Sequence, residues 1–207
     1  SPERKICMVT TKPRVTTRAL VMTAMLSAIA FILMFINFSV PFMPSFIKLD
    51  ISELPALIGS FSLGPVYGVV ICLVKNLLNL TQTSTGGVGE LSNFLLGTMF
   101  VFPAGLIYQR MKNRKGAIIG SLVGAVIMAV GSVFTNIFLV YPIYYQVAAP
   151  KDAILQAYQA IIPAMESVEQ SIICFNMPFT FLKAMLSVLV TFLIYKRISP
   201  IIKGVHK

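Results

Sequence analysis

Polar side chains interrupt one apolar stretch, residues 171–198, that is long enough to cross the hydrocarbon core of a bilayer. Asn176, Thr180 and Lys183 follow one another at spacings of four and three residues, so on a helix they share one face. An ammonium group in the middle of a membrane span costs at least about 2.5–3.5 kcal/mol on insertion scales. The stripe therefore indicates a site for a small polar solute. The alternative is a structural lysine that carbonyl groups or a carboxylate satisfy.

Further polar residues lie in the expected outer halves of the other apolar stretches. They are Asn76, Asn79, Glu90, Asn93 and Asn136. Amides outnumber charges, which favours a neutral, hydrogen-bonding ligand, and neighbouring Phe and Tyr residues would suit a flat aromatic ring. Simpler interpretations exist. Glu90 would also be favourable at a helix N-terminus, Tyr141 could belong to an interfacial aromatic belt, and a neighbouring helix could satisfy Asn136.

The chain has none of the HExxH, GxSxG, CxxC or Walker motifs that would support catalysis, and its one histidine, His206, lies at the C-terminal end. Its three cysteines have neither the spacing of a metal site nor that of a disulfide pair. We therefore expect no enzyme, no metal and no cofactor, and interpret the polar groups as a binding site.

The composition indicates the kind of protein that positions these groups. Of 207 residues, 57% are hydrophobic and 12% are charged, whereas soluble domains have about 25% charged residues. The net charge of +10 could indicate nucleic acid, but thirteen of the seventeen basic residues lie in three short segments, 4–18, 110–115 and 196–207. This is the positive-inside pattern of a protein that spans a lipid bilayer, so we expect no nucleic acid partner.

Six apolar stretches predict an all-α integral membrane protein, a six-transmembrane-helix bundle with cytoplasmic N- and C-termini. They are residues 18–37, 52–63, 66–80, 90–107, 116–145 and 171–198. The second stretch is short for a span, but it must cross if the three basic segments are to share one side. Residues 152–167, in the longest outer loop, are predicted to be partly helical with an interruption at Pro163. The predicted division is a polar tail over 1–17, a substrate-binding domain over 18–198 and a basic cytoplasmic tail over 199–207.

Small residues predict two helix-contact faces. Gly116, Gly120 and Gly124 form GxxxGxxxG, and Ala24 and Ala28 form a small-xxx-small pair. The alanine pair could serve packing within the bundle or docking of a partner subunit.

Two further charged positions have open interpretations. Lys75 could extend to the membrane surface or pair with a carboxylate on the outer side, and a structural role is favoured. The loop 41–50 contains Lys48 and Asp50 and is rich in apolar residues, which indicates a lid over the bundle or an interfacial loop with a local ion pair.

Four segments resemble the substrate-binding S component of energy-coupling factor (ECF) vitamin transporters, and most of all its riboflavin-specific members. They read TAMLSAIAFILM, DISELPALIGSFSLGPVYGVVICLVKNLL, GELSNFLLG and NMPFTFLK. The resemblance covers about residues 20–196. It implies a six-helix bundle of the bacterial cytoplasmic membrane without its own ATPase, which binds its vitamin on the extracellular side. Its implied partners are riboflavin, bound as transported substrate, and a transmembrane coupling protein that carries two cytoplasmic ATPase subunits.

The resemblance also implies roles for particular residues. Ala24 and Ala28 match the family's docking motif on the first helix. The family's Pro-Phe-Asn-x-x-Lys reads Pro-Phe-Thr-x-x-Lys here, so Thr180 replaces an amide, for which Asn176 would compensate. Lys183 and other polar residues would contact the ring edge or the ribityl hydroxyls, and the loop 41–50 would cover the site. The predicted binding residues are Lys48, Asp50, Glu90, Asn93, Asn136, Tyr141, Asn176, Thr180 and Lys183.

Two other classes of function remain open at this point. One is a self-sufficient secondary transporter or channel for another small neutral solute, which the lack of inverted repeats and of paired membrane carboxylates disfavours. The other is a membrane assembly subunit that binds no small molecule.

Overall fold

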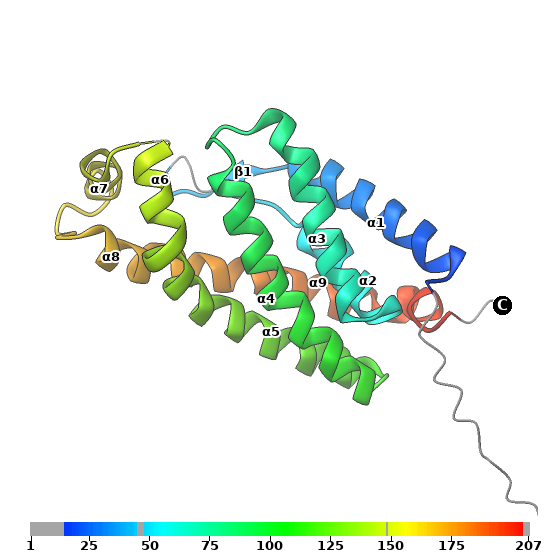
Figure 1. Ribbon diagram of the computed structural model, residues 1–207. Helices are drawn as coiled ribbons and strands as arrows, with labels where there is room; N and C mark the ends of the chain where they lie inside the picture. Colours follow the sequence, from blue (N-terminus) through cyan, green and yellow to red (C-terminus); the bar gives the residue numbers. More distant parts are fainter. Residues whose placement is uncertain (1–14, 45–47, 148, 205–207) are drawn as a thin grey trace, which may run out of the picture.

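The computed structural model describes residues 15–44, 48–147 and 149–204. In these ranges the regular secondary structure is helical apart from one antiparallel pair of two-residue strands, β1 (Phe38–Ser39) and β2 (Lys48–Leu49) (Figure 1). The first helices of the chain are α1 (Thr17–Phe35), α2 (Glu53–Leu63), α3 (Pro65–Asn79) and the 3₁₀ turn η1 (Leu80–Gln82). The remaining helices are α4 (Val88–Arg110), α5 (Arg114–Thr135), α6 (Tyr141–Val147), α7 (Lys151–Gln159), α8 (Val168–Ser171) and α9 (Met177–Lys203).

Two π-helical turns make longer helices out of shorter ones. The turn η2 (Asn136–Val140) joins α5 to α6, and η3 (Ile172–Asn176) joins α8 to α9. Four helical runs are long and apolar enough to cross a membrane: Thr17–Phe35, Val88–Arg110, Arg114–Val147 and Val168–Lys203. The all-helical prediction is confirmed. The six-span count would need the shorter helices α2 and α3 to cross as well, and it stays a prediction.

The expected helices lie close to those observed, with two differences. The helix expected within 152–167 ends earlier, because α7 stops at Gln159 and non-helical residues precede α8. The last helix begins before 171 and runs to Lys203, beyond the expected end at 198. The division into two tails and one domain stays a prediction.

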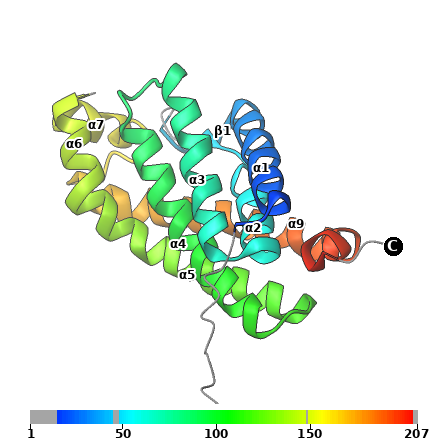
Figure 2. The same cartoon turned by 45° about the vertical axis from the view of Figure 1, so that its right-hand side comes forward.

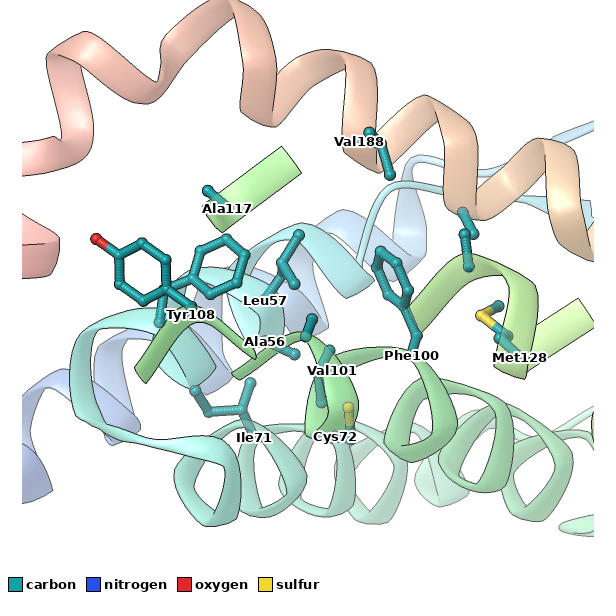
Figure 3. Packing of buried hydrophobic residues seen from close by; sticks show 14 of the residues in the cluster. Ala56, Leu57, Ile71, Cys72, Phe100, Val101, Tyr108, Ala117, Met128 and Val188 are labelled. Atoms are coloured by element: carbon teal, nitrogen blue, oxygen red, sulfur yellow. The ribbon is translucent and has the colours of Figure 1, made fainter. Parts of the chain in front are cut away.

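The short helix α2 lies at the centre of the bundle. It contacts α1, α3, α4 and α9, and Ala56 and Leu57 have no exposed surface. Figure 3 shows these two residues among side chains from α3, α4, α5 and α9. Because protein rather than lipid surrounds most of α2, eleven residues suffice for a helix that is too short for a typical span.

A sharp turn folds α3 back along α2. Gly64 has φ 124°, a left-handed conformation that favours glycine, and Pro65 begins α3. The helices then approach so closely that a Cβ on Gly68 would lie 2.7 Å from Ser60 Cβ and 3.0 Å from the Ala56 carbonyl oxygen. Glycine at position 68 therefore permits the contact between α2 and α3.

The predicted glycine face of α5 packs against α4. A Cβ on Gly120 would lie 2.7 Å from the carbonyl oxygen of Ala104, and one on Gly124 would meet the Phe100 carbonyl oxygen. The prediction of a helix-contact face is confirmed.

The described residues of the three basic segments gather at one end of the bundle. Arg18 Nη2 donates to the Ile201 carbonyl oxygen at 3.1 Å, which joins the start of α1 to the end of α9. Arg114, at the start of α5, donates to the Phe192 carbonyl oxygen of α9 at 3.0 Å and lies over the Phe192 ring. Figures 1 and 2 both show the α4–α5 turn near this end and α6 to α8 at the other. The two ends of the molecule therefore differ in charge, as the sequence predicts.

Candidate functional site

A cavity of about 710 Å³ lies among the helices, away from the basic end. Helices α1 to α6 and α9 all contribute lining residues. Examples are Met34 of α1, Asn76 of α3, Leu96 of α4 and Phe179 of α9. Its volume falls within the range of roughly 300–1,000 Å³ that small-molecule sites occupy. The cavity is therefore large enough for a vitamin-sized ligand.

The cavity brings together most of the predicted binding residues. Those that line it are Asp50, Glu90, Asn93, Asn136, Tyr141, Asn176, Thr180 and Lys183. Lys48 lies in β2, where its backbone pairs with Ser39, but its side chain lies outside the described part of the chain. The spatial grouping is as expected from the sequence, while the role of each residue in binding stays a prediction.

Lys183 belongs to a buried group of charges. Its Nζ lies 3.3 Å from Glu53 Oε1 and 3.8 Å from Asp50 Oδ1. Glu53 Oε1 also lies 3.4 Å from Lys75 Nζ, and Lys75 donates at 2.8 Å to the Ser52 hydroxyl, which donates to Asp50 Oδ1 at 2.6 Å. We call Asp50, Glu53, Lys75 and Lys183 the four-charge cluster. Two ammonium groups balance two carboxylates, so the cluster as a whole is neutral.

The cluster bears on the expectations for Lys183 and Lys75, and the role of Lys183 stays open. Lys183 has the carboxylate partners of the structural alternative, yet it also lines the cavity. Lys75 has no exposed surface, so the idea that it extends to the membrane surface is wrong, and its pairing with a carboxylate is confirmed.

Asp50 stays ionised at neutral pH. Burial raises the pKa of this carboxyl, but Lys183, Lys75 and the hydrogen bonds from Ser52 together outweigh burial and hold the pKa below its ordinary value. Because the folded-state pKa is lowered, the stabilising effect of Asp50 is present above its unfolded-state pKa and is lost as the pH falls through the folded-state pKa.

Glu90 holds the loop between α3 and α4. Its Oε1 accepts from Asn79 Nδ2 at 2.9 Å, and its Oε2 accepts from the Thr83 and Thr85 hydroxyls at 2.9 and 3.5 Å. It also lies in the first turn of α4, where a carboxylate is favourable. Glu90 therefore shapes the cavity wall through the loop it organises.

Tyr141 and Asn176 form a closed set of hydrogen bonds with Tyr158 of α7. Asn176 Nδ2 donates to Tyr141 Oη at 2.6 Å, Tyr158 Oη donates to Asn176 Oδ1 at 2.6 Å, and the two hydroxyls lie 2.8 Å apart. Tyr141 is buried, so its interpretation as an aromatic-belt residue is wrong. Burial raises the pKa of Tyr158, which keeps its hydroxyl protonated as a donor.

Both π turns lie at the cavity. Asn136 is the first residue of η2 and Asn176 is the last of η3, and both side chains line the cavity. A π turn inserts an extra residue into a helix and often marks a functional site. These two turns redirect amide side chains from long apolar helices toward the cavity.

Two amide oxygens in the cavity wall are unused. The Oδ1 atoms of Asn76 and Asn93 are buried and have no hydrogen-bond partner among the described residues, although Asn76 Nδ2 donates to the Cys72 carbonyl oxygen at 2.7 Å. A buried acceptor without a partner costs about 1–3 kcal/mol. Both residues line the cavity, but these two oxygens expose almost no surface, so the amides would have to turn toward a ligand before its hydroxyl or N–H donors supplied the missing partners.

Some lining residues were not in the predicted set. Glu53, Asn76 and Asn79 line the cavity, and their polarity inside or beside apolar stretches was the available signal. Asn37 also lines it, but nothing in its local sequence distinguishes it from an ordinary loop residue.

Outside the cavity, two features bear on the remaining expectations. Ala24 and Ala28 are exposed on α1, so within the described chain they do not serve packing inside the bundle, and docking stays a prediction. Residues 45–47 of the expected lid 41–50 lie outside the described residues. Of the remainder, Pro44 and Leu49 are buried and Phe42 is 86% exposed. The lid also stays a prediction.

Comparisons with known proteins agree on one family. The sequence profile of the substrate-specific component of ECF transporters matches residues 18–195. The riboflavin transporter RibU of Staphylococcus aureus (strain TCH60) is 32% identical over 188 residues, which cover 91% of this chain and 94% of the relative. The riboflavin transporter FmnP of Bacillus subtilis (strain 168) is 29% identical over 188 residues, which cover 88% and 93%.

The fold agrees as well. A solved S component of a bacterial ECF transporter superposes with a TM-score of 0.70 at 33% sequence identity, and the match covers 90% of this chain and 98% of that one.

Proposed function

We propose that this chain, a member of the substrate-specific components of ECF transporters, binds riboflavin in the cavity and so captures the vitamin for uptake. It is a multi-pass membrane protein of a transport family, not an enzyme. In this proposal riboflavin is transported cargo rather than a cofactor. The relatives named as riboflavin transporters support the choice of vitamin.

One observation carries the proposal. The cavity combines a neutral four-charge cluster with the unused acceptor oxygens of Asn76 and Asn93. Riboflavin is neutral and offers ring N–H and ribityl hydroxyl donors to such oxygens, while its ring carbonyls can accept from Lys183. Phe179 in the cavity wall suits a flat aromatic ring.

The proposal includes partners and orientation. The basic end would face the cytoplasm with both termini, the cavity would receive riboflavin from outside, and six helices would span the membrane. ATP hydrolysis would come from two cytoplasmic ATPase subunits bound through a transmembrane coupling protein, since the chain would have no ATPase of its own.

A binding titration tests the proposed function. The purified chain should quench riboflavin fluorescence saturably at one site, and the chain contains no tryptophan whose emission would interfere. Thiamine and biotin, as control vitamins, should not compete. A folded, monodisperse preparation that gives no saturable quenching would contradict riboflavin binding.

The orientation predicts opposite accessibility of two exposed positions. Single cysteines replacing Lys112, at the basic end, and Asp152, in α7, should react with an impermeant thiol reagent from opposite sides of the membrane. The background would lack Cys7, Cys72 and Cys174. Labelling of both positions from the same side would contradict the six-span arrangement, because the helical run Arg114–Val147 between them would then not cross.

Asn93→Leu should weaken riboflavin binding about 5–10-fold, because a hydrogen bond contributes roughly 1–1.5 kcal/mol net. The ligand-free melting temperature should stay unchanged or rise, since an acceptor without a partner is removed. Thr98→Val is the matched control: Thr98 Oγ1 is also buried without a described partner, but Thr98 does not line the cavity. A fall in melting temperature with unchanged affinity would show that Asn93 is structural.

A further inference from the structure

Lys75 lies behind the cavity wall. Its side chain has no exposed surface, and it is not among the residues that line the cavity. Its Nζ nevertheless reaches Glu53 Oε1 at 3.4 Å and the Ser52 hydroxyl at 2.8 Å. Glu53 itself lines the cavity, and Ser52 donates a hydrogen bond to Asp50, which also lines it.

Glu53 is shared between two ammonium groups. The same oxygen, Oε1, lies 3.4 Å from Lys75 and 3.3 Å from Lys183. Neither carboxylate oxygen of Glu53 has a hydrogen bond from the described residues, so these two ammonium groups are its described neutralising contacts. Without Lys75, Lys183 would face the two carboxylates of Asp50 and Glu53 alone.

The balance of charge within the buried four-charge cluster strongly affects the energy of each charged group. Removing one member of a buried ion pair leaves an uncompensated charge, which the remaining opposite charge is attracted to. An ammonium group held between two unbalanced carboxylates is less able to turn a donor toward a neutral ligand. The availability of the Lys183 ammonium group to a ligand therefore depends on Lys75, which does not line the cavity.

We propose that Lys75 is a positioning residue for riboflavin binding: by neutralising Glu53 from behind, it leaves the Lys183 ammonium group available to the ligand. This inference rests on the proposed function and assigns to Lys75 a role beyond the stability of α3. It differs from direct contact, because Lys75 acts through Glu53, Ser52 and Lys183.

The test compares three variants and one control variant by riboflavin titration and by ligand-free melting temperature. Lys75→Met should weaken binding at least about 10-fold. Lys75→Arg, which keeps the cation, should bind more tightly than Lys75→Met. Lys75→Met combined with Glu53→Gln restores a neutral cluster, and it should bind at least about fivefold more tightly than Lys75→Met alone. Tyr195→Phe, which removes the buried Tyr108–Tyr195 hydrogen bond of 2.8 Å at the basic end, controls for a general loss of stability and should leave affinity unchanged.

The outcomes separate the inference from the proposed function. If the wild-type chain binds riboflavin and Lys75→Met binds equally well, or if the neutral double variant does not recover affinity, the positioning role is overturned. If Lys75→Met does not fold, the double variant decides alone: riboflavin binding by the folded protein supports the role, and its failure to bind overturns it. Failure of the wild-type chain to bind riboflavin would instead contradict the proposed function.

Discussion

Replacing Lys183 by methionine is expected to weaken riboflavin binding about 10–100-fold. A hydrogen bond from a charged donor to a ligand oxygen contributes roughly 1.5–3 kcal/mol, and Lys183 is the ammonium group of the four-charge cluster that lines the cavity. Methionine keeps a similar length and apolar stem but donates no hydrogen bond. The affinity would be measured by quenching of riboflavin fluorescence.

The same substitution also tests the structural alternative. Because Lys183 pairs with Asp50 and Glu53, Lys183→Met should lower the ligand-free melting temperature as well. Adding Asp50→Asn rebalances the buried charge and should restore part of the stability without restoring the affinity. A lowered melting temperature with unchanged affinity in Lys183→Met would show that the lysine is only structural.

The second large effect concerns α1. Ala24→Leu together with Ala28→Leu should leave riboflavin binding by the isolated chain nearly intact but abolish ATP-dependent uptake in cells that contain the coupling protein and ATPases. The two alanines are exposed on α1, so their replacement should not alter the shape of the cavity. Leucine side chains would prevent the close helix approach that small residues permit.

A matched control uses the same spacing on another exposed helix face. Val126 and Val130 are 52% and 51% exposed on α5, and changing both to leucine should leave uptake unchanged. Normal uptake by the alanine double variant would show that the docking surface lies elsewhere.

Most helices could be predicted from the sequence because apolar length and basic flanks act locally. The stripe of Asn176, Thr180 and Lys183 also indicated one side of the cavity correctly, since helical periodicity places them together. The shortness of α2 was harder to interpret, because its burial by four neighbouring helices is a property of the whole bundle.

The partners of the polar residues could not be predicted. Tyr158 closes a hydrogen-bonded set with Tyr141 and Asn176, but it lies on the short helix α7, whose docking no local pattern specifies. Likewise, Glu53 begins α2 and reads as an ordinary first-turn carboxylate, whereas its contacts with Lys75 and Lys183 depend on how three helices meet. The two π turns have no sequence signature comparable to a cap or a proline.

The structure of the chain with riboflavin bound would test the central claim most directly. The account predicts the flavin inside the cavity, with its donors near the unused oxygens of Asn76 and Asn93 and with Lys183 Nζ near a ligand oxygen. Riboflavin bound at another surface, with the cavity empty, would contradict it.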